Sequence, residues 1–373
     1  WEYDSLTQQY YYHKFDKKMA DLNWNNPALV KEMLEVLRFW LDSGIDGFRL
    51  DVINFLNTDG VLDDNPAAEG SQIHKYDINQ PGLKNALELI RSTVDEYDNK
   101  FLVGEVGSDK IEVLKMYQSP KMMDVVFNFN FGSIPNFDLN RIYQEISAME
   151  KEMPGLPTLF FGSHDNPRLM NRLADLNLQK ALALHCLILT AKGVPFIYYG
   201  DEIGMQNIVA HNLDEIVDIQ AKTRYQLALN AEKTQTEALE YANLHNRDRS
   251  RSPMQWDSTN NAGFTTAKPW IKIQENYQLV HVDAQLQKPE SFLNEIKKLL
   301  AIRKEQPALQ LGSYSYLNRE DQMLKYGRVF KNEIVHIVIN FGESKNFTLP
   351  NNSVLLHGDE ILNPNEYLIY KTF

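Results

Sequence analysis

Three acidic residues stand at the ends of three separate apolar runs in this sequence. Asp51 follows the run in GFRLDV, Glu105 the run in FLVGEV, and Asp165 the run in LFFGSHD. Each run is short and rich in β-forming residues, which predicts a carboxylate at the end of each of three strands. In a parallel α/β barrel, the carboxyl ends of the strands form the face that carries the chemistry. The spacings of 54 and 60 residues therefore suggest three acids that converge on one pocket.

Three converging carboxylates suit the cleavage of a glycosidic bond. The reaction passes through an oxocarbenium-like transition state, and it needs one acid to protonate the leaving oxygen and one carboxylate on the opposite face of the sugar ring. In a retaining enzyme the second carboxylate attacks the anomeric carbon, and the two groups lie about 5–5.5 Å apart. Repulsion at that distance raises the pKa of one carboxyl group and keeps it protonated near neutral pH. A third carboxylate would hold the ring hydroxyls as the ring flattens.

Two neighbouring residues fit the same chemistry. Arg49 precedes Asp51 by two positions, so on a strand both side chains project to the same side, where the cation would keep the carboxylate ionised. His164, next to Asp165, would supply a neutral donor for a sugar hydroxyl. Each residue alone also has a structural explanation. Arg49 and Asp51 could form an ion pair at the end of a strand, and Glu105 could be a solvated strand end. Only the combination is specific.

The elements that must position these residues alternate along the chain. Helical spacing of apolar residues predicts helices at 27–43, 81–97, 109–118, 138–151 and 176–192. Short apolar runs between them predict strands at 45–52, 100–106, 122–129, 157–163 and 194–200. Strands separated by helices indicate right-handed βαβ units and a parallel sheet.

The remaining sequence departs from this alternation. A polar insertion at 201–288 has helical periodicity only near 216–243, and its length favours a functional loop region over a linker. One more helix is predicted at 289–305. From about residue 309, short β-rich runs separated by Gly, Asn and Asp predict an antiparallel β module. The five parallel strands counted in this way are too few to close a barrel of eight.

Composition excludes several classes of protein. The chain has 373 residues, of which 43% are hydrophobic, and this excludes a mostly disordered chain. The net charge of −12 argues against a nucleic-acid-binding surface, which is usually basic. Since no run reaches the ~18 apolar residues of a membrane helix and no signal peptide is visible, we expect a cytoplasmic protein without a membrane partner.

Other motifs give little support to other chemistries. The single cysteine, Cys186, lies in an apolar helical run, which predicts a buried thiol. The nine histidines lack metal-ligand spacing, and Phe55 stands where an EF-hand needs its first Asp, so we expect no metal in this chain. The absence of GxGxxG, GxxxxGK[ST] and GxSxG motifs leaves nucleotide binding and serine hydrolysis unsupported.

Together, these residues resemble the α-amylase superfamily of glycoside hydrolases (family 13), in particular the branch of oligo-1,6-glucosidases and α-glucosidases. GFRLDVINF is similar to the family's nucleophile segment, VGEV to its acid/base segment, and FGSHDNPRL to the segment that stabilises the transition state. The resemblance implies a retaining mechanism in which Asp51 is the nucleophile, Glu105 the acid/base and Asp165 the transition-state stabiliser.

The same resemblance implies a set of substrate-binding residues. It assigns the family's arginine to Arg49, a substrate ligand to His164 and a further sugar contact to Arg168. NRDRSRSPMQWD followed by AGF resembles a signature of this branch, which implies that Arg251 faces the outer sugar subsites. Val52, directly after the predicted nucleophile, is similar to the residue in members that act on α-1,6 bonds, so the resemblance favours α-1,6 over α-1,4 linkages.

The resemblance also predicts the domain organisation. MADLNW resembles the end of the domain inserted after the third barrel strand, so we expect residues 1–24 to end that domain, 25–308 to form the C-terminal part of the catalytic barrel, and 309–373 to form a β-sandwich domain. Family members place three barrel strands before the position of Trp1. We therefore expect a (β/α)8-type barrel that lacks its first three strands, a fragment that is weak or inactive alone. The missing part would carry an Asp and a His that hold the sugar, and a calcium or magnesium site where one exists; no cofactor is expected in this chain.

Alternatives of three kinds remain open. Trehalose-6-phosphate hydrolase and sucrose isomerase belong to the same branch, and the basic cluster that would favour the phosphorylated substrate is not visible in the sequence. The amylase-like ectodomains of amino-acid transporter heavy chains keep the barrel but lose the acids, whereas all three acids are present here. A fragment that only binds sugar is the third. In each enzymatic case the expected partner is a small oligosaccharide.

Overall fold

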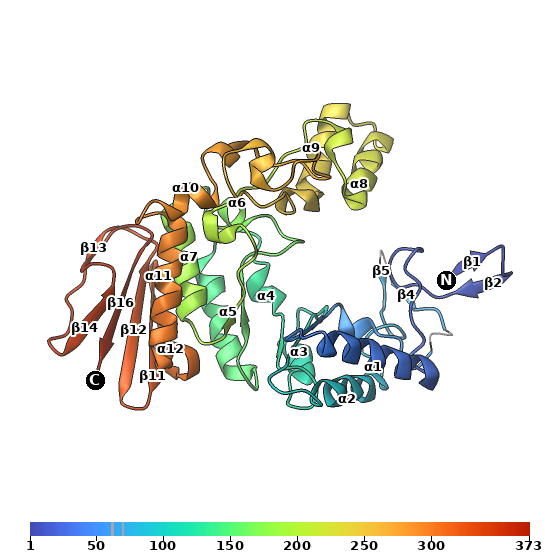
Figure 1. The fold of residues 1–373 in the computed structure, drawn as a ribbon, viewed down its shortest axis with the longest axis horizontal. Helices are drawn as coiled ribbons and strands as arrows, with labels where there is room; N and C mark the ends of the chain where they lie inside the picture. The colour runs from blue at the N-terminus through green and yellow to red at the C-terminus, as the bar shows by residue number, and fades with distance from the viewer. Residues whose placement is uncertain (61–62, 69–70) are drawn as a thin grey trace. The chain divides into compact units, whose positions relative to one another are not determined.

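The computed structural model describes residues 1–60, 63–68 and 71–373. The acidic stretch DGVLDDNPAAEG, where Phe55 argues against an EF-hand, lies partly outside the described residues, at 61–62 and 69–70. The chain divides into two compact units, one made of residues 1–128 and 151–157 and the other of residues 129–150 and 158–373 (Figure 1).

The first unit is built on a three-stranded parallel sheet in the order β3-β6-β7. Its strands are β3 (Gly47–Leu50), β6 (Phe101–Gly104) and β7 (Val125–Val126). The helices around them are α1 (Pro27–Asp42), α2 (Leu83–Val94) and α3 (Ile111–Tyr117). Since α2 connects β3 to β6 and α3 connects β6 to β7, the predicted βαβ alternation is confirmed in this unit.

Local sequence explains how the chain enters this sheet. Asn26 caps α1 with its side chain, and Pro27 takes the first helical position, where its missing N–H costs nothing. After the helix, Gly47 opens β3 with a φ of +153°, and a Cβ at that position would lie only 1.8 Å from the carbonyl oxygen of Phe101. Glycine is therefore required for β3 to approach β6 this closely.

The other elements of the first unit are short. Two antiparallel hairpins pair β1 (Glu2–Asp4) with β2 (Gln9–Tyr11) and β4 (Ala67–Ala68) with β5 (Ser71–Gln72). A 3₁₀ turn, η1 (Ile53–Phe55), follows β3 and begins the long loop that leads to α2.

The second unit contains two more parallel strands, β8 (Thr158–Leu159) and β9 (Val194–Pro195). Its first helices are α4 (Phe129–Gly132), α5 (Leu139–Glu152, whose last two residues are counted in the first unit), α6 (Leu169–Arg172) and α7 (Leu178–Thr190). Helix α7 is buried on nearly all sides because its sequence is apolar all round. Cys186 lies within it, and burial raises the pKa of its thiol, so the predicted buried thiol is confirmed.

Where the sequence predicted one helical stretch near 216–243, the polar insertion forms two helices. These are α8 (Ile219–Asn230) and α9 (Gln235–His245), which pack against each other. The rest of the insertion is largely irregular, with α10 (Val282–Leu286) near its end. The insertion also contains short 3₁₀ turns: η2 (Asp201–Ile203), η3 (Leu213–Glu215), η4 (Arg247–Ser250), η5 (Asn260–Gly263) and η6 (Glu275–Gln278).

The C-terminal residues form the predicted antiparallel β module. A five-stranded sheet has the order β10-β11-β12-β16-β14, and β13 pairs separately with β15. The strands are β10 (Ser313–Glu320), β11 (Met323–Phe330), β12 (Glu333–Asn340), β13 (Lys345–Asn346), β14 (Ser353–His357), β15 (Ile361–Leu362) and β16 (Glu366–Thr372). Helices α11 (Phe292–Glu305) and α12 (Pro307–Leu311) precede the sheet.

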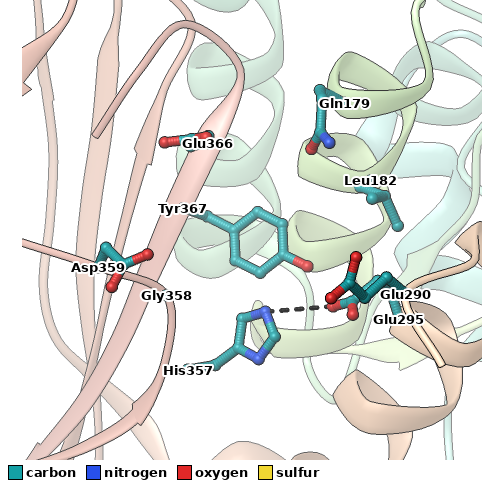
Figure 2. Close-up of a pocket in the computed structure, with 9 residues that line it drawn as sticks. All are labelled: Gln179, Leu182, Glu290, Glu295, His357, Gly358, Asp359, Glu366 and Tyr367. Atoms are coloured by element: carbon teal, nitrogen blue, oxygen red, sulfur yellow. Dashed lines mark ion pairs between the residues drawn. The ribbon is translucent and has the colours of Figure 1, made fainter. Parts of the chain in front are cut away.

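The sheet packs against α7 and α12, and α11 lies beside α7 (Figure 1). The fully buried Arg328 donates hydrogen bonds to the carbonyl oxygens of Thr190 (2.7 Å) and Gly312 (2.8 Å), which ties β11 to the end of α7. A cavity of about 310 Å³ lies along the same junction, and the ion pair of His357 with Glu295 measures 3.4 Å. Figure 2 shows the residues that line this cavity, with the ion pair dashed. The β module is thus anchored on the helices by buried polar contacts as well as by apolar packing.

Candidate active site

The first unit places two of the three predicted carboxylates side by side. Leu50 on β3 pairs with Gly104 on β6, so Asp51 and Glu105 occupy the next position on each strand. The Glu105 N–H donates a 2.9 Å hydrogen bond to the carbonyl oxygen of Leu50, which extends the pairing to the residues that carry the acids. Because hydrogen-bonded strands lie about 4.8 Å apart, the two carboxylates leave the same edge of the sheet as neighbours.

Arg49 bridges these two carboxylates. Its Nη1 lies 2.8 Å from Asp51 Oδ1, and its Nη2 donates to Glu105 Oε2. The side chain of Asp51 is 65% exposed, whereas that of Glu105 is only 13% exposed. One carboxylate is therefore open to an incoming molecule, and the other is held in a more enclosed position.

The chain turns sharply after Asp51. Val52 has left-handed backbone angles (φ 36°, ψ 47°), which are uncommon for a β-branched residue and impose local strain. The buried Asn54 then accepts a 3.0 Å hydrogen bond from the Gly107 N–H, so it ties the loop after β3 to the loop after β6. Sequence reasoning missed Asn54 as a support for the site, although it lies within the GFRLDVINF segment.

The third carboxylate, Asp165, belongs to the second unit, just beyond β8. His164 Nε2 lies 3.2 Å from Asp165 Oδ2, and Arg251 Nη2 donates to Asp165 Oδ1 at 2.7 Å. Arg251 also donates from Nε to the His164 carbonyl oxygen at 2.7 Å. Three of the predicted site residues are thus brought together here, although Arg251 is 86 residues from Asp165 in sequence.

A second arginine near Asp165 was not predicted. Arg247 Nη1 lies 3.5 Å from Asp165 Oδ1, and its Nη2 lies 2.9 Å from Asp218 Oδ1. The hydrogen bond with Asp218 raises the pKa of Arg247. Burial acts to raise the pKa of Asp218, but the hydrogen bonds from Arg247 outweigh it and leave that pKa lowered. The only sequence signal was the run of arginines in NRDRSRS, which does not say which of them reaches Asp165.

Arg168, for which the resemblance predicted a sugar contact, lies away from solvent in this structure. Its side chain is fully buried, and its guanidinium lies over the rings of Tyr198 (4.9 Å) and Tyr199 (4.7 Å). Arg168 donates to the Tyr199 carbonyl oxygen and lies 3.5 Å from Asp201 Oδ1. Burial raises the pKa of Asp201 to about 6. A guanidinium enclosed in this way braces the turn that carries Tyr199, and it is not open to a ligand.

The described residues hold neither a cluster of metal ligands nor a helix that could span a membrane. Within 1–60, 63–68 and 71–373, no group of three or more His, Cys, Asp or Glu side chains is arranged to hold a metal ion. Across the same residues, none of the helices combines the length and the apolar character needed to cross a membrane.

Comparison with known proteins places this chain in a family. The sequence pattern described as "Alpha amylase, catalytic domain" matches residues 1–312. The chain belongs to the alpha-amylase family. It is therefore a glycoside hydrolase by family, and its fold is the alpha-amylase barrel type followed by an antiparallel β domain, as the sequence predicted.

Named relatives of this alpha-amylase family chain are mostly glucosidases. It is 33% identical to an oligo-1,6-glucosidase of Halalkalibacterium halodurans, over 95% of this chain and 67% of that protein. The crystal structure of Bacillus licheniformis trehalose-6-phosphate hydrolase matches with a TM-score of 0.87 and 29% identity, over 100% of this chain and 73% of that one. A human amino acid transporter heavy chain is 32% identical over 94% of this chain and 50% of its own length. The chain thus spans about two thirds of the first relative, and the roles of individual site residues stay predictions.

Proposed function

We propose that this alpha-amylase family chain hydrolyses α-1,6-glucosidic bonds of short oligosaccharides with retention of configuration. The observation that carries the proposal is the Arg49 bridge between Asp51 and Glu105 at the ends of adjacent parallel strands. Adjacent strands lie about 4.8 Å apart, and this spacing supports a carboxylate separation near the ~5–5.5 Å of retaining glycosidases over the ~6.5–9.5 Å of inverting ones.

In the proposed reaction the exposed Asp51 carboxylate attacks the anomeric carbon of the glucosyl unit. The bond from that carbon to the leaving oxygen breaks, and Glu105 gives its proton to this oxygen. Glu105 then takes a proton from water, which attacks the same carbon and releases Asp51. Arg49 contacts both carboxylates and holds them in position, and it offsets negative charge at Asp51 between turnovers.

The proposal assigns Asp165 to the hydroxyls of the reacting sugar. It is 44% exposed and is flanked by His164 and two arginines, Arg251 and Arg247. The two arginines hold the carboxylate in one orientation, so its oxygens are prepared to accept hydroxyl hydrogen bonds as the ring distorts. A carboxylate prepared in this way binds the distorted ring better than the relaxed one, which lowers the barrier.

The α-1,6 linkage is supported by Val52 after the predicted nucleophile and by the printed names of relatives such as the oligo-1,6-glucosidase. A second candidate is the hydrolysis of trehalose 6-phosphate, because a trehalose-6-phosphate hydrolase has the same fold at a TM-score of 0.87. Two expectations from the sequence stay predictions. The first is that the chain is weak or inactive without the missing barrel strands, and the second is that it is cytoplasmic.

The test compares hydrolysis of isomaltose, maltose and trehalose 6-phosphate by the chain, with the anomer of the first product read by NMR. We expect isomaltose to be preferred and α-glucose to appear first. Glu105→Gln should accumulate a glucosyl adduct on Asp51 when an aryl α-glucoside with a good leaving group is supplied, detectable by mass spectrometry. Val52→Thr should shift the preference toward maltose.

Asp46→Asn is the matched control, since it makes the same isosteric change at the opposite end of β3, where Asp46 is exposed. It should leave hydrolysis unchanged, whereas Asp51→Asn should abolish it. β-Glucose as the first product, or an adduct on a residue other than Asp51, would contradict the mechanism. A preference for trehalose 6-phosphate would replace the proposed substrate.

A further inference from the structure

The cavity between the helices of the second unit and the β module is lined by residues other than those predicted for the active site. Four of the side chains that line it are carboxylates, those of Glu290, Glu295, Asp359 and Glu366. Its volume of about 310 Å³ lies at the lower end of the range for small-molecule sites, so an occupant must be small.

Most of the negative charge in this cavity is not compensated. Glu295 pairs with Lys298 at 2.6 Å and with His357 at 3.4 Å. The other three carboxylates form no ion pair with any side chain in the described part of the chain. Burial lowers the pKa of His357, so its ring is neutral at neutral pH and adds no positive charge. The cavity therefore attracts a cation.

Tyr367 adds a buried polar group that lacks a partner. Its side chain is only 7% exposed, and its ring stacks on that of His357 with the ring centres 5.3 Å apart. The hydroxyl points from β16 toward the helices, into the cavity (Figure 2), and it forms no hydrogen bond with the residues that the structure describes. Because a buried tyrosine hydroxyl normally finds a hydrogen-bond partner, this one indicates a ligand in the cavity.

The carboxylates stand on two facing walls of the cavity (Figure 2). Glu290 and Glu295 lie at the start of α11, whereas Asp359 and Glu366 belong to the β module. Gly358 fixes the second wall, because its φ is +88° and a Cβ there would lie 2.2 Å from the Tyr367 carbonyl oxygen. The fold therefore sets both walls before a ligand arrives, which lowers the entropy cost of binding.

We propose that this cavity binds a small linear diamine, with one ammonium group at each wall. Carboxylates only accept hydrogen bonds and each ammonium group donates three, so two charged ends match two acidic walls. The Tyr367 hydroxyl accepts a further hydrogen bond. A metal ion fits less well, because no three His, Cys, Asp or Glu side chains of the described residues are arranged to hold one. The inference does not depend on the proposed function, and the bound diamine stabilises the junction of α11 with the β module.

The test titrates the chain with butane-1,4-diamine, 1-butylamine and butane-1,4-diol by calorimetry and follows thermal unfolding in parallel. We expect the diamine to bind about fivefold more tightly than the monoamine, and the neutral diol not to bind measurably. At about ten times its Kd, the diamine should raise the Tm by about 3–5 °C. Glu290→Gln and Asp359→Asn, one on each wall, should each weaken diamine binding about three- to fivefold, and Tyr367→Phe about two- to threefold.

Glu343→Gln is the matched control, because Glu343 is an exposed carboxylate of the same β module and does not line the cavity. It should leave the diamine affinity unchanged. Equal affinities for diamine and monoamine, or an equal loss in Glu343→Gln, would overturn the inference, since the attraction would then come from diffuse surface charge. Binding of the diol as tightly as the diamine would overturn it too, because the cavity would then recognise hydroxyl groups and not charge. So would a Tm that the diamine does not change.

Discussion

Replacement of Gly47 by alanine should separate β3 from β6 and so disturb the Arg49 bridge. The new Cβ would lie 1.8 Å from the Phe101 carbonyl oxygen, a distance that no side chain can accept, so the strand must shift. That shift breaks two backbone hydrogen bonds of 2.9 Å, from Phe101 N–H to Asp46 O and from Glu105 N–H to Leu50 O. Each is worth about 1 kcal/mol, and the backbone conformation adds about 1–2 kcal/mol, for a loss of about 3–4 kcal/mol.

Gly44→Ala is the matched control. Gly44 also has a positive φ, +92°, but a Cβ there would meet nothing within 4 Å, so only the backbone cost of about 1–2 kcal/mol applies. The expected difference between the two variants is about 2 kcal/mol in the free energy of unfolding of the first unit.

Urea unfolding and amide hydrogen exchange measure this difference. Because the chain has two units, the exchange of the Phe101 and Glu105 amides is the local readout, and these amides should exchange about thirtyfold faster in Gly47→Ala than in Gly44→Ala. Hydrolysis by Gly47→Ala should fall in parallel, since the two carboxylates lose their shared guanidinium. Equal exchange rates in the two variants would refute the argument. Glycine at position 47 would then be explained by its backbone flexibility and not by the close approach of the two strands.

Three other variants test the site and its supports. Arg49→Met should lower kcat/KM about a hundredfold, because it removes two partly exposed charge-assisted contacts that are worth about 2–3 kcal/mol together. The control Arg38→Met removes a surface ion-pair partner and should leave kcat/KM unchanged. Asn54→Ala should cost about 1–3 kcal/mol of stability, measured by urea unfolding, and should lower kcat about tenfold; an unchanged kcat would assign it a purely structural role. Burial raises the pKa of Asp201 from 3.8 to about 6, so its contribution to stability is present below pH 4 and is lost as the pH rises through 6. Asp201→Asn should remove up to about 3 kcal/mol of that pH dependence, as measured by unfolding at pH 4 and pH 7.

The elements around the site could be predicted because their signals are local. The helices at 27–43 and 81–97 appear as Pro27–Asp42 and Leu83–Val94, since caps and apolar spacing act within a few residues. The strands were expected longer than they are, as with 122–129 against Val125–Val126, because an apolar run marks burial, while strand length depends on how far a neighbouring strand pairs.

By itself, the sequence determined which residues could carry chemistry. Two-residue alternation on a strand placed Arg49 on the side of Asp51, and the end of each apolar run marked a carboxylate at a strand terminus. These are properties of the chain over a few residues, so no tertiary contact was needed to predict them. The resemblance of the segments to a known family added roles to them.

Tertiary structure decided which of those residues are accessible and which partners they meet. Arg168 and Arg251 both belong to motifs that predicted sugar contacts. In the folded chain, however, Arg168 is buried against two tyrosines, whereas Arg251 donates a hydrogen bond to Asp165. Arg247 also lies near Asp165 only because segments far apart in sequence pack together. The physical reason is that exposure and long-range charge contacts depend on how segments far apart in sequence pack together, and residue type and spacing do not contain that information.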